Sequence, residues 1–124
     1  MAKHADLGNE GEIIAGNYLK SKGYEVLHYN WRDQKAEVDI IAKIENLYVF
    51  VEVKTRSTDF FGLPEETISK KKIKLLGIAS EAFCHRYNMK DIEIRYDVIS
   101  VIKNQNETEV QHIEDAFFPN NMNL

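Results

Sequence analysis

The chain has 124 residues, of which 44% are hydrophobic and 29% charged, and its formal net charge is −4. This length and composition predict one compact domain spanning residues 1–124, and the acidic balance argues against a protein that coats nucleic acid by bulk electrostatic attraction. Because no apolar run is long enough for a membrane span or a secretory signal, and a lone Cys84 cannot form an internal disulfide, we expect a cytoplasmic protein without a membrane partner.

The N-terminal segment has a helical pattern. Apolar residues from Ile14 to Leu19 recur at steps of three and four, and Gly23 is a typical stop signal after them. Glu12 borders this apolar stripe near the predicted start of the helix, where the helix dipole also favours a carboxylate. We therefore expect Glu12 to lie close to the face that the helix buries.

Three strands are predicted next. They cover Tyr24–Tyr29, Glu37–Ala42 and residues 47–56, with Asn30 to Asp33 leading out of the first. Lys43–Asn46 is a plausible hairpin turn, so the second and third strands should be antiparallel neighbours.

The third strand carries two charges within an apolar run, L-Y-V-F-V-E-V-K-T-R. Alternation along a strand sends Glu52 and Lys54 to the same face. The predicted hairpin brings Asp39 opposite a position between Phe50 and Glu52, within roughly 4.5 to 8 Å by Cβ separation. Asp39, Glu52 and Lys54 should then share one small patch.

The remaining chain predicts a loop, a helix and two strands. Thr55 to Pro64 contains helix and strand breakers, Ile68 to Tyr87 has helical spacing, Ile92 to Ile102 has the composition of an inner strand, and a short strand is expected near Val110 to Glu114. This order predicts an α/β fold with a mixed sheet covered by helices.

The second predicted helix begins with a lysine cluster. Its inward stripe, extended backwards by three or four residues, reaches Lys72, whereas Lys70, Lys71 and Lys74 are better placed to face water. A solvated helix face is the simpler interpretation of those three. Lys72 is the one member that we expect to approach the sheet.

The patch of Asp39, Glu52 and Lys54 has two interpretations. A Glu-x-Lys pair on an exposed strand is a common ion pair of little energetic consequence. Two carboxylates in a partly buried cleft, in contrast, either share a proton or capture a cation, and oxygen ligands suit Mg²⁺ or Mn²⁺. Such an ion can activate water on a phosphodiester, and Lys54 can offset the charge that develops.

Other chemistry-bearing residues give weaker signals. Trp31 and Phe60–Phe61 can stack on bases, but core or loop-anchoring roles are the simpler expectation. Cys84 is expected to be a small buried hydrophobe. The histidines lack the short paired spacings of zinc sites and receive no role: His4, His28, His85 and His112.

Six short motifs follow one another along the chain: G-x-x-G-E-x-x-A-x-x-Y-L (Gly8 to Leu19), N-W-R (Asn30 to Arg32), E-V-D-I-I-A (Glu37 to Ala42), F-V-E-V-K-T-R (Phe50 to Arg56), R-Y-D-V-I (Arg95 to Ile99) and I-E-D-A-F (Ile113 to Phe117). Together they resemble the YraN-like family of small bacterial proteins, and the resemblance covers nearly the whole chain. The sequence departs from the family pattern at Ala36, where glycine is usual, and at Asp115, where asparagine is usual.

The resemblance implies a restriction-endonuclease-like fold, a mixed sheet with an antiparallel hairpin core flanked by helices, similar to Holliday-junction resolvases and other PD-(D/E)xK nucleases. It also implies a phosphodiesterase that uses Mg²⁺ or Mn²⁺ on DNA, with branched DNA and a homodimer as the expectations by analogy. Carried over by position, the metal-binding residues are Glu12, Asp39 and Glu52, the catalytic lysine is Lys54, and the phosphate contacts are Arg56 and Lys72. A nucleic-acid-binding module without turnover and an interaction protein in DNA processing remain as alternatives.

Overall fold

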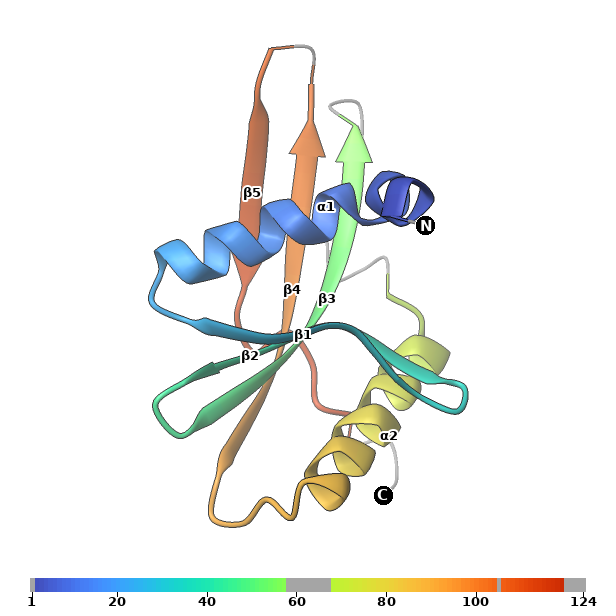
Figure 1. Ribbon diagram of the computed structural model, residues 1–124, viewed down its shortest axis with the longest axis vertical. Coiled ribbons are helices and arrows are strands. Elements are labelled where there is room, and N and C mark those ends of the chain that lie inside the picture. The colour runs from blue at the N-terminus through green and yellow to red at the C-terminus, as the bar shows by residue number, and fades with distance from the viewer. Residues whose placement is uncertain (1, 58–67, 105, 120–124) are drawn as a thin grey trace.

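The computed structural model describes residues 2–57, 68–104 and 106–119, with side chains throughout except those of residues 2–9 and 57. A mixed five-stranded sheet has the order β1-β2-β3-β4-β5 and carries two helices (Figure 1). The elements are α1 (Ala2–Ser21), β1 (Glu25–Asp33), β2 (Ala36–Ile44), β3 (Leu47–Ser57), α2 (Lys70–Arg86), β4 (Glu93–Lys103) and β5 (Thr108–Ile113).

The sheet combines antiparallel and parallel pairings. Strands β1, β2 and β3 form an antiparallel meander, β3 and β4 are parallel, and β5 returns antiparallel to β4. Because parallel neighbours need a crossover connection, α2 lies between β3 and β4 in the sequence. The predicted mixed α/β sheet with an antiparallel hairpin and flanking helices is confirmed, and it is consistent with a restriction-endonuclease-like fold.

The helix ends follow local signals. Gly23 has a φ of 97° and ends α1, and the N–H of Tyr24 donates to the Leu19 carbonyl at 3.0 Å. Ser69 caps α2, since its hydroxyl accepts the backbone N–H of Lys72 at 3.1 Å. The cap fixes the direction of the first turn of α2, which carries Lys72.

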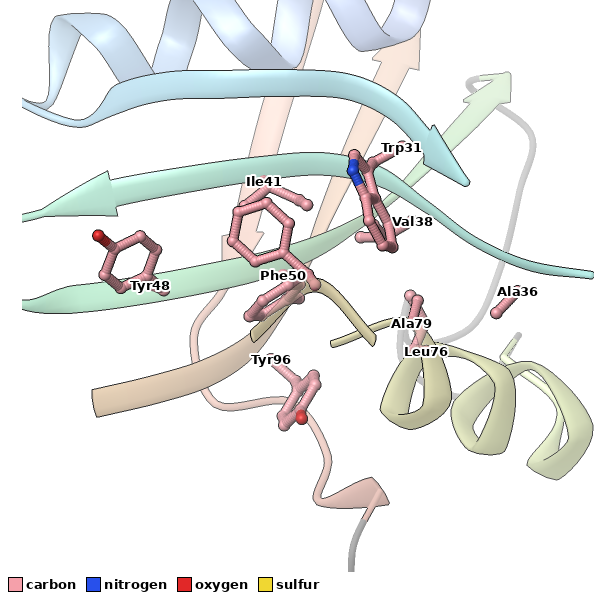
Figure 2. Close-up of a cluster of buried hydrophobic side chains, with 10 residues drawn as sticks. Trp31, Ala36, Val38, Ile41, Tyr48, Phe50, Leu76, Ala79 and Tyr96 are labelled. Atoms are coloured by element: carbon pink, nitrogen blue, oxygen red, sulfur yellow. The ribbon is translucent and has the colours of Figure 1, made fainter. Parts of the chain in front are cut away.

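Two separate cores hold the helices on opposite faces of the sheet. The α2 core (Figure 2) consists of Trp31, Ala36, Val38, Ile41, Tyr48, Phe50, Leu76, Ala79, Phe83 and Tyr96. The α1 core consists of Ala15, Leu19, Ile40, Ala42, Val49, Val51, Ile99 and Val101. Trp31 is only 7% exposed and contacts Phe83 edge-on, so its expected core role is confirmed, and Cys84 packs partly buried against the same core.

Several predicted boundaries were wrong, among them that of the hairpin turn, since Lys43 and Ile44 belong to β2. Asn30 to Asp33 belong to β1, because Arg32 and Asp33 pair with the first residues of β2. Residues 55–57 belong to β3, because pairing with β4 continues to Ser57 opposite Lys103. Phe60–Phe61 and the rest of the expected loop to Pro64 lie outside the described residues. Within the described ranges, neither helix has the length and hydropathy to cross a membrane.

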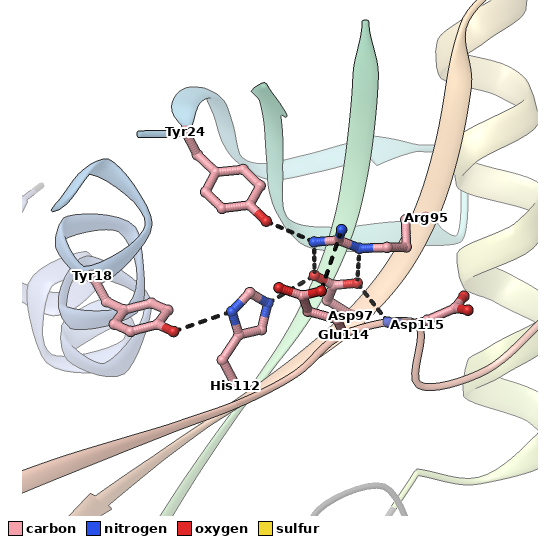
Figure 3. Close-up of polar contacts among 7 residues, drawn as sticks. All are labelled: Tyr18, Tyr24, Arg95, Asp97, His112, Glu114 and Asp115. Carbon is pink, nitrogen blue, oxygen red and sulfur yellow. Dashed lines mark hydrogen bonds and ion pairs between the residues drawn. The ribbon is translucent and has the colours of Figure 1, made fainter. Parts of the chain in front are cut away.

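A largely buried charged network joins α1, the residue before β1, β4 and β5 (Figure 3). Asp97, fully buried, accepts two hydrogen bonds from Arg95 at 2.8 and 2.9 Å and one from the backbone N–H of Asp115 at 3.0 Å. His112 Nε2 lies 2.7 Å from the same carboxylate, and its Nδ1 lies 3.3 Å from the Tyr18 hydroxyl. We call this set, completed by Tyr24 and Glu114 on the Arg95 guanidinium, the Asp97 network.

The Asp97 network is a structural ion pair that the sequence did not reveal. Burial works to raise the pKa of Asp97, but the hydrogen bonds from His112, Arg95 and the Asp115 N–H outweigh it, and the pKa falls below 3.8. A depressed carboxyl pKa means that the ionised group stabilises the fold above the pKa of the unfolded chain. His112, which received no role from its spacing, is therefore part of the framework.

We predict that Asp97→Asn lowers the free energy of unfolding at pH 7 by about 3 kcal/mol, because it leaves the partly buried Arg95 without its closest charge partner. Glu114→Gln, at the exposed end of the network, should cost less than about 0.5 kcal/mol. Urea denaturation from pH 7 to pH 3 measures both. The difference in the free energy of unfolding between wild type and Asp97→Asn should become smaller as the pH falls through the native pKa of Asp97. A difference independent of pH would show that the ionised Asp97 does not stabilise the fold.

Candidate metal and phosphodiester site

The site forms where β2 and β3 separate. Their ladder runs from Ile44 opposite Leu47 to Ile40 opposite Val51, and one more step along the register brings Asp39 beside Glu52. Beyond this pair the Asp39 side chain takes the place of a backbone carbonyl as acceptor. Its Oδ2 accepts a hydrogen bond from the backbone N–H of Val53 at 2.8 Å. The predicted proximity of Asp39 to Glu52 follows directly from this register.

A bend in the β1–β2 hairpin accompanies the separation. Val38 belongs to the α2 core and Ile40 to the α1 core, although residues two apart on a regular strand share a face. The rungs Trp31 to Val38 and Tyr29 to Ile40 flank this change, and Asn30 between them has a φ of 53°. Both strands therefore turn together, and Asp39 lies at the turning point.

Two ammonium groups bracket the Glu52 carboxylate. Lys54 Nζ lies 3.2 Å from Glu52 Oε2, and Lys72 Nζ lies 3.6 Å from Oε1. Glu52 is 3% exposed, and within the described ranges no hydrogen-bond donor reaches Oε1. The predicted approach of Lys72 to the sheet is confirmed, whereas the neighbouring lysines of α2 are exposed: Lys70, Lys71 and Lys74.

Glu12 reaches the same region from α1. Its Oε1 accepts a hydrogen bond from the Asn30 amide at 2.9 Å, and it interacts electrostatically with both Glu52 and Lys72. Gly11, the preceding residue, lets the helix approach β3, because a Cβ there would collide with the Thr55 hydroxyl. The helix thereby brings a third carboxylate toward the separation of β2 and β3.

Burial and neighbouring carboxylates raise the pKa of Asp39 and of Glu12. Burial and the charge of Glu52 raise the pKa of Asp39 from 3.8 to about 7, although the Val53 N–H works in the opposite direction. Burial also raises the pKa of Glu12, against the hydrogen bond from Asn30. A cation at this place would relieve the repulsion that these shifts express.

The donor set suits a hard cation, but as it stands it is a pair with a more distant third member. Asp39 and Glu52 supply carboxylate oxygens of the type that Mg²⁺ and Mn²⁺ prefer. In the part of the chain that the structure describes, no group of three or more His, Cys, Asp or Glu side chains is close enough to hold a metal ion. Glu12 is placed to complete a site by a side-chain movement or through a bridging water.

Two residues were predicted to contact phosphate. Lys72 forms an ion pair with Glu52. Arg56 is half-buried on β3, two residues beyond Lys54. Sequence reasoning missed Asn30, which both bends β1 and holds Glu12. Its residue type was the available signal, because asparagine is several-fold enriched at positive φ. It also missed Glu37, whose charge raises the pKa of Glu12.

Relatives of this protein align with almost its whole chain. A sequence profile described as "Uncharacterised protein family UPF0102" matches residues 11–101. A UPF0102 protein from Christiangramia forsetii is 48% identical over 118 residues, covering 95% of this chain and 98% of the relative. One from Flavobacterium psychrophilum is 47% identical with the same coverage, and one from Phocaeicola vulgatus is 38% identical over 119 residues, covering 96% and 98%.

We predict that Asp39→Asn stabilises the metal-free protein at neutral pH. The unfolded chain releases the Asp39 proton near pH 3.8 and the native protein near pH 7, so stability falls as the pH rises between these values. The substitution removes this loss in the free energy of unfolding, about 4 kcal/mol when complete, and should raise the Tm at pH 8 by roughly 15 °C.

Thermal unfolding in EDTA at pH 8 and pH 4 measures this effect, with Glu109→Gln on the exposed face of β5 as the matched control. The gain in stability should shrink to less than about 1 kcal/mol at pH 4, because native Asp39 is then protonated and the pH is close to the unfolded pKa of 3.8. A variant less stable than wild type at pH 8 would show that Asp39 is a structural carboxylate.

Proposed function

We propose that this chain, which belongs to the uncharacterised protein family UPF0102, hydrolyses DNA phosphodiester bonds with the help of a metal ion. UPF0102 is the YraN-like family that its motifs indicate. Because the family description names no chemistry, the proposal rests on the site itself. The observation that carries the proposal is the buried pair of Asp39 and Glu52, with an ammonium group on each oxygen of Glu52. Branched DNA is the proposed substrate by analogy with resolvases.

The residues present fit a hard divalent cation. Asp39 and Glu52 would hold Mg²⁺ or Mn²⁺, and Glu12 would complete the ligand set from α1. When bound, such an ion activates a water molecule and stabilises charge on the phosphoryl oxygens. Its presence would also favour the ionised form of Asp39, whose pKa is raised in the metal-free protein.

The lysines supply charge at the same place. Lys54 lies on the face of β3 that carries Glu52, so its ammonium can orient the attacking water or offset negative charge in the transition state. Lys72 and Arg56 approach from α2 and from the end of β3, where they would position the phosphate. Positive charge around the phosphate would stabilise the negative charge that develops during displacement at phosphorus.

A nucleic-acid-binding module is the second candidate, and one observation favours it. Both oxygens of Glu52 already face lysines, so a carboxylate occupied in this way can serve as a structural ion pair. Binding without cleavage under every metal tried would support this alternative against the nuclease.

The nuclease proposal is tested with labelled junction, flap, single-stranded and duplex DNA in Mn²⁺ and in Mg²⁺. Wild type should cut at least one branched substrate. Asp39→Asn and Lys54→Ala should each lose about a hundredfold or more in rate, whereas Lys90→Ala, an exposed lysine after α2, should cut normally. Cutting that persists unchanged in both site variants would reject the assignment.

A second prediction concerns Lys72 and metal affinity. Lys72 and a cation would compete for Glu52, so Lys72→Met should bind Mn²⁺ about tenfold more tightly than wild type in the absence of DNA. Titration calorimetry measures this without any turnover. Lys71→Met, which alters the exposed neighbouring lysine, is the matched control. Equal Mn²⁺ affinities in wild type and Lys72→Met would mean that Lys72 does not compete with the cation for Glu52.

A further inference from the structure

Residues of the β1–β2 hairpin tip and of α2 line an open pocket of about 470 Å³. Figure 1 shows these two elements side by side. Its lining residues are Asp33, Gln34, Lys35, Ala36, Leu75 and Ile78. The α2 side and Ala36 are apolar, and Ile78 is 44% exposed, a large apolar side chain left facing solvent. The acidic member, Asp33, is neutralised by Arg86, whose Nη2 lies 2.7 Å from Oδ1.

Exposed lysines surround this apolar wall. On α2, Lys71 precedes Leu75 by four residues and Lys74 precedes Ile78 by four, so each lysine lies one turn from an apolar lining residue on the same side of the helix. Lys35 contributes a third exposed ammonium from the hairpin tip. An aliphatic surface can pack against the face of a base, and the flanking ammonium groups can contact its phosphates.

The pocket adjoins the candidate site on both of its walls. Leu75 follows Lys72 by three residues on α2, a rise of about 4.5 Å. Ala36 precedes Asp39 by three residues on β2, about 10 Å of strand. With a rise of 3.4 Å per stacked nucleotide, the pocket is about three nucleotides or fewer from a phosphate at Glu52.

From these positions we infer that the pocket takes one unpaired base of the DNA strand next to the cleaved phosphate. The inference rests on the proposed function and names its substrate class: DNA with a single-stranded segment beside the site, rather than continuous duplex. A paired base is stacked and cannot enter a side pocket, whereas an unpaired base reaches it at little cost. The Gln34 amide at the rim can donate to or accept from the edge of the base.

The test measures binding in EDTA, so it does not depend on cleavage. Three fluorescent duplexes are compared by anisotropy: one blunt, one with a short single-stranded tail, and one with the same tail made of abasic residues. Wild type should bind the tail with bases about tenfold more tightly than the abasic tail. Ile78→Asp should reduce this ratio to nearly one, because it places a charge on the apolar wall.

Two matched variants separate the causes. Lys71→Ala should weaken binding to both tails by a similar factor and reduce the salt dependence, because it removes a phosphate contact only. Ile94→Asp, an equally exposed isoleucine at the start of β4, should retain the wild-type ratio.

An affinity ratio near one in wild type, or a ratio that Ile78→Asp leaves unchanged, would overturn the inference. It would also be overturned if Ile78→Asp changed the sedimentation of the free protein and no preference for bases were found. That result would identify the apolar wall as a protein–protein contact. Failure of the nuclease assay alone, with the base preference intact, would reject catalysis and retain the pocket.

Discussion

The hydrogen bond from the Val53 N–H to the Asp39 carboxylate is the contact on which the site depends. In a continuous hairpin a backbone carbonyl would accept from this position, and β2 would stay beside β3 to its end. Because the Asp39 side chain takes the place of that carbonyl, β2 can separate from β3 while the Val53 N–H keeps a hydrogen-bond acceptor, and β2 stays paired with β1 as far as Ala36. The opening that results sits beside Glu52, and it admits α1 from one side and α2 from the other. Glu12 and Lys72 approach Glu52 from α1 and α2, and these helices pack in separate cores.

Two buried aspartates show how the protein distinguishes framework from site. Asp97 is surrounded by Arg95, His112 and a backbone N–H, and its pKa is lowered despite burial. Asp39 is buried beside Glu52, and its pKa is raised. The first arrangement is already satisfied and contributes to stability, whereas the second retains repulsion that an added cation can relieve. Charge partners, rather than burial, separate the two, so an unrelieved carboxylate pair is the stronger indication of chemistry.

The sequence predicted what depends on local periodicity and missed what depends on bends and distant partners. Alternation placed Glu52 and Lys54 on one face, and helical spacing aimed Lys72 at the sheet. The left-handed backbone of Asn30 was not predictable from alternation, because a single residue at positive φ reverses the pattern without changing the composition. The Asp97 network was hidden for another reason: His112 and Asp97 lie on different strands, and only the pairing of β4 with β5 brings them together.

Under the proposed function, helix α2 would combine two tasks that constrain which DNA this acidic chain could bind. With a formal net charge of −4, the molecule gains little from long-range attraction to a polyanion, so affinity must come from short-range contacts. The helix presents Lys72 to the site from its first turn and a wall of Leu75 and Ile78 one to two turns later. A uniform duplex offers phosphates to the lysines but nothing to that wall. DNA with an unpaired base offers both at once, so a protein built in this way would select substrates by an interruption in base pairing rather than by their charge.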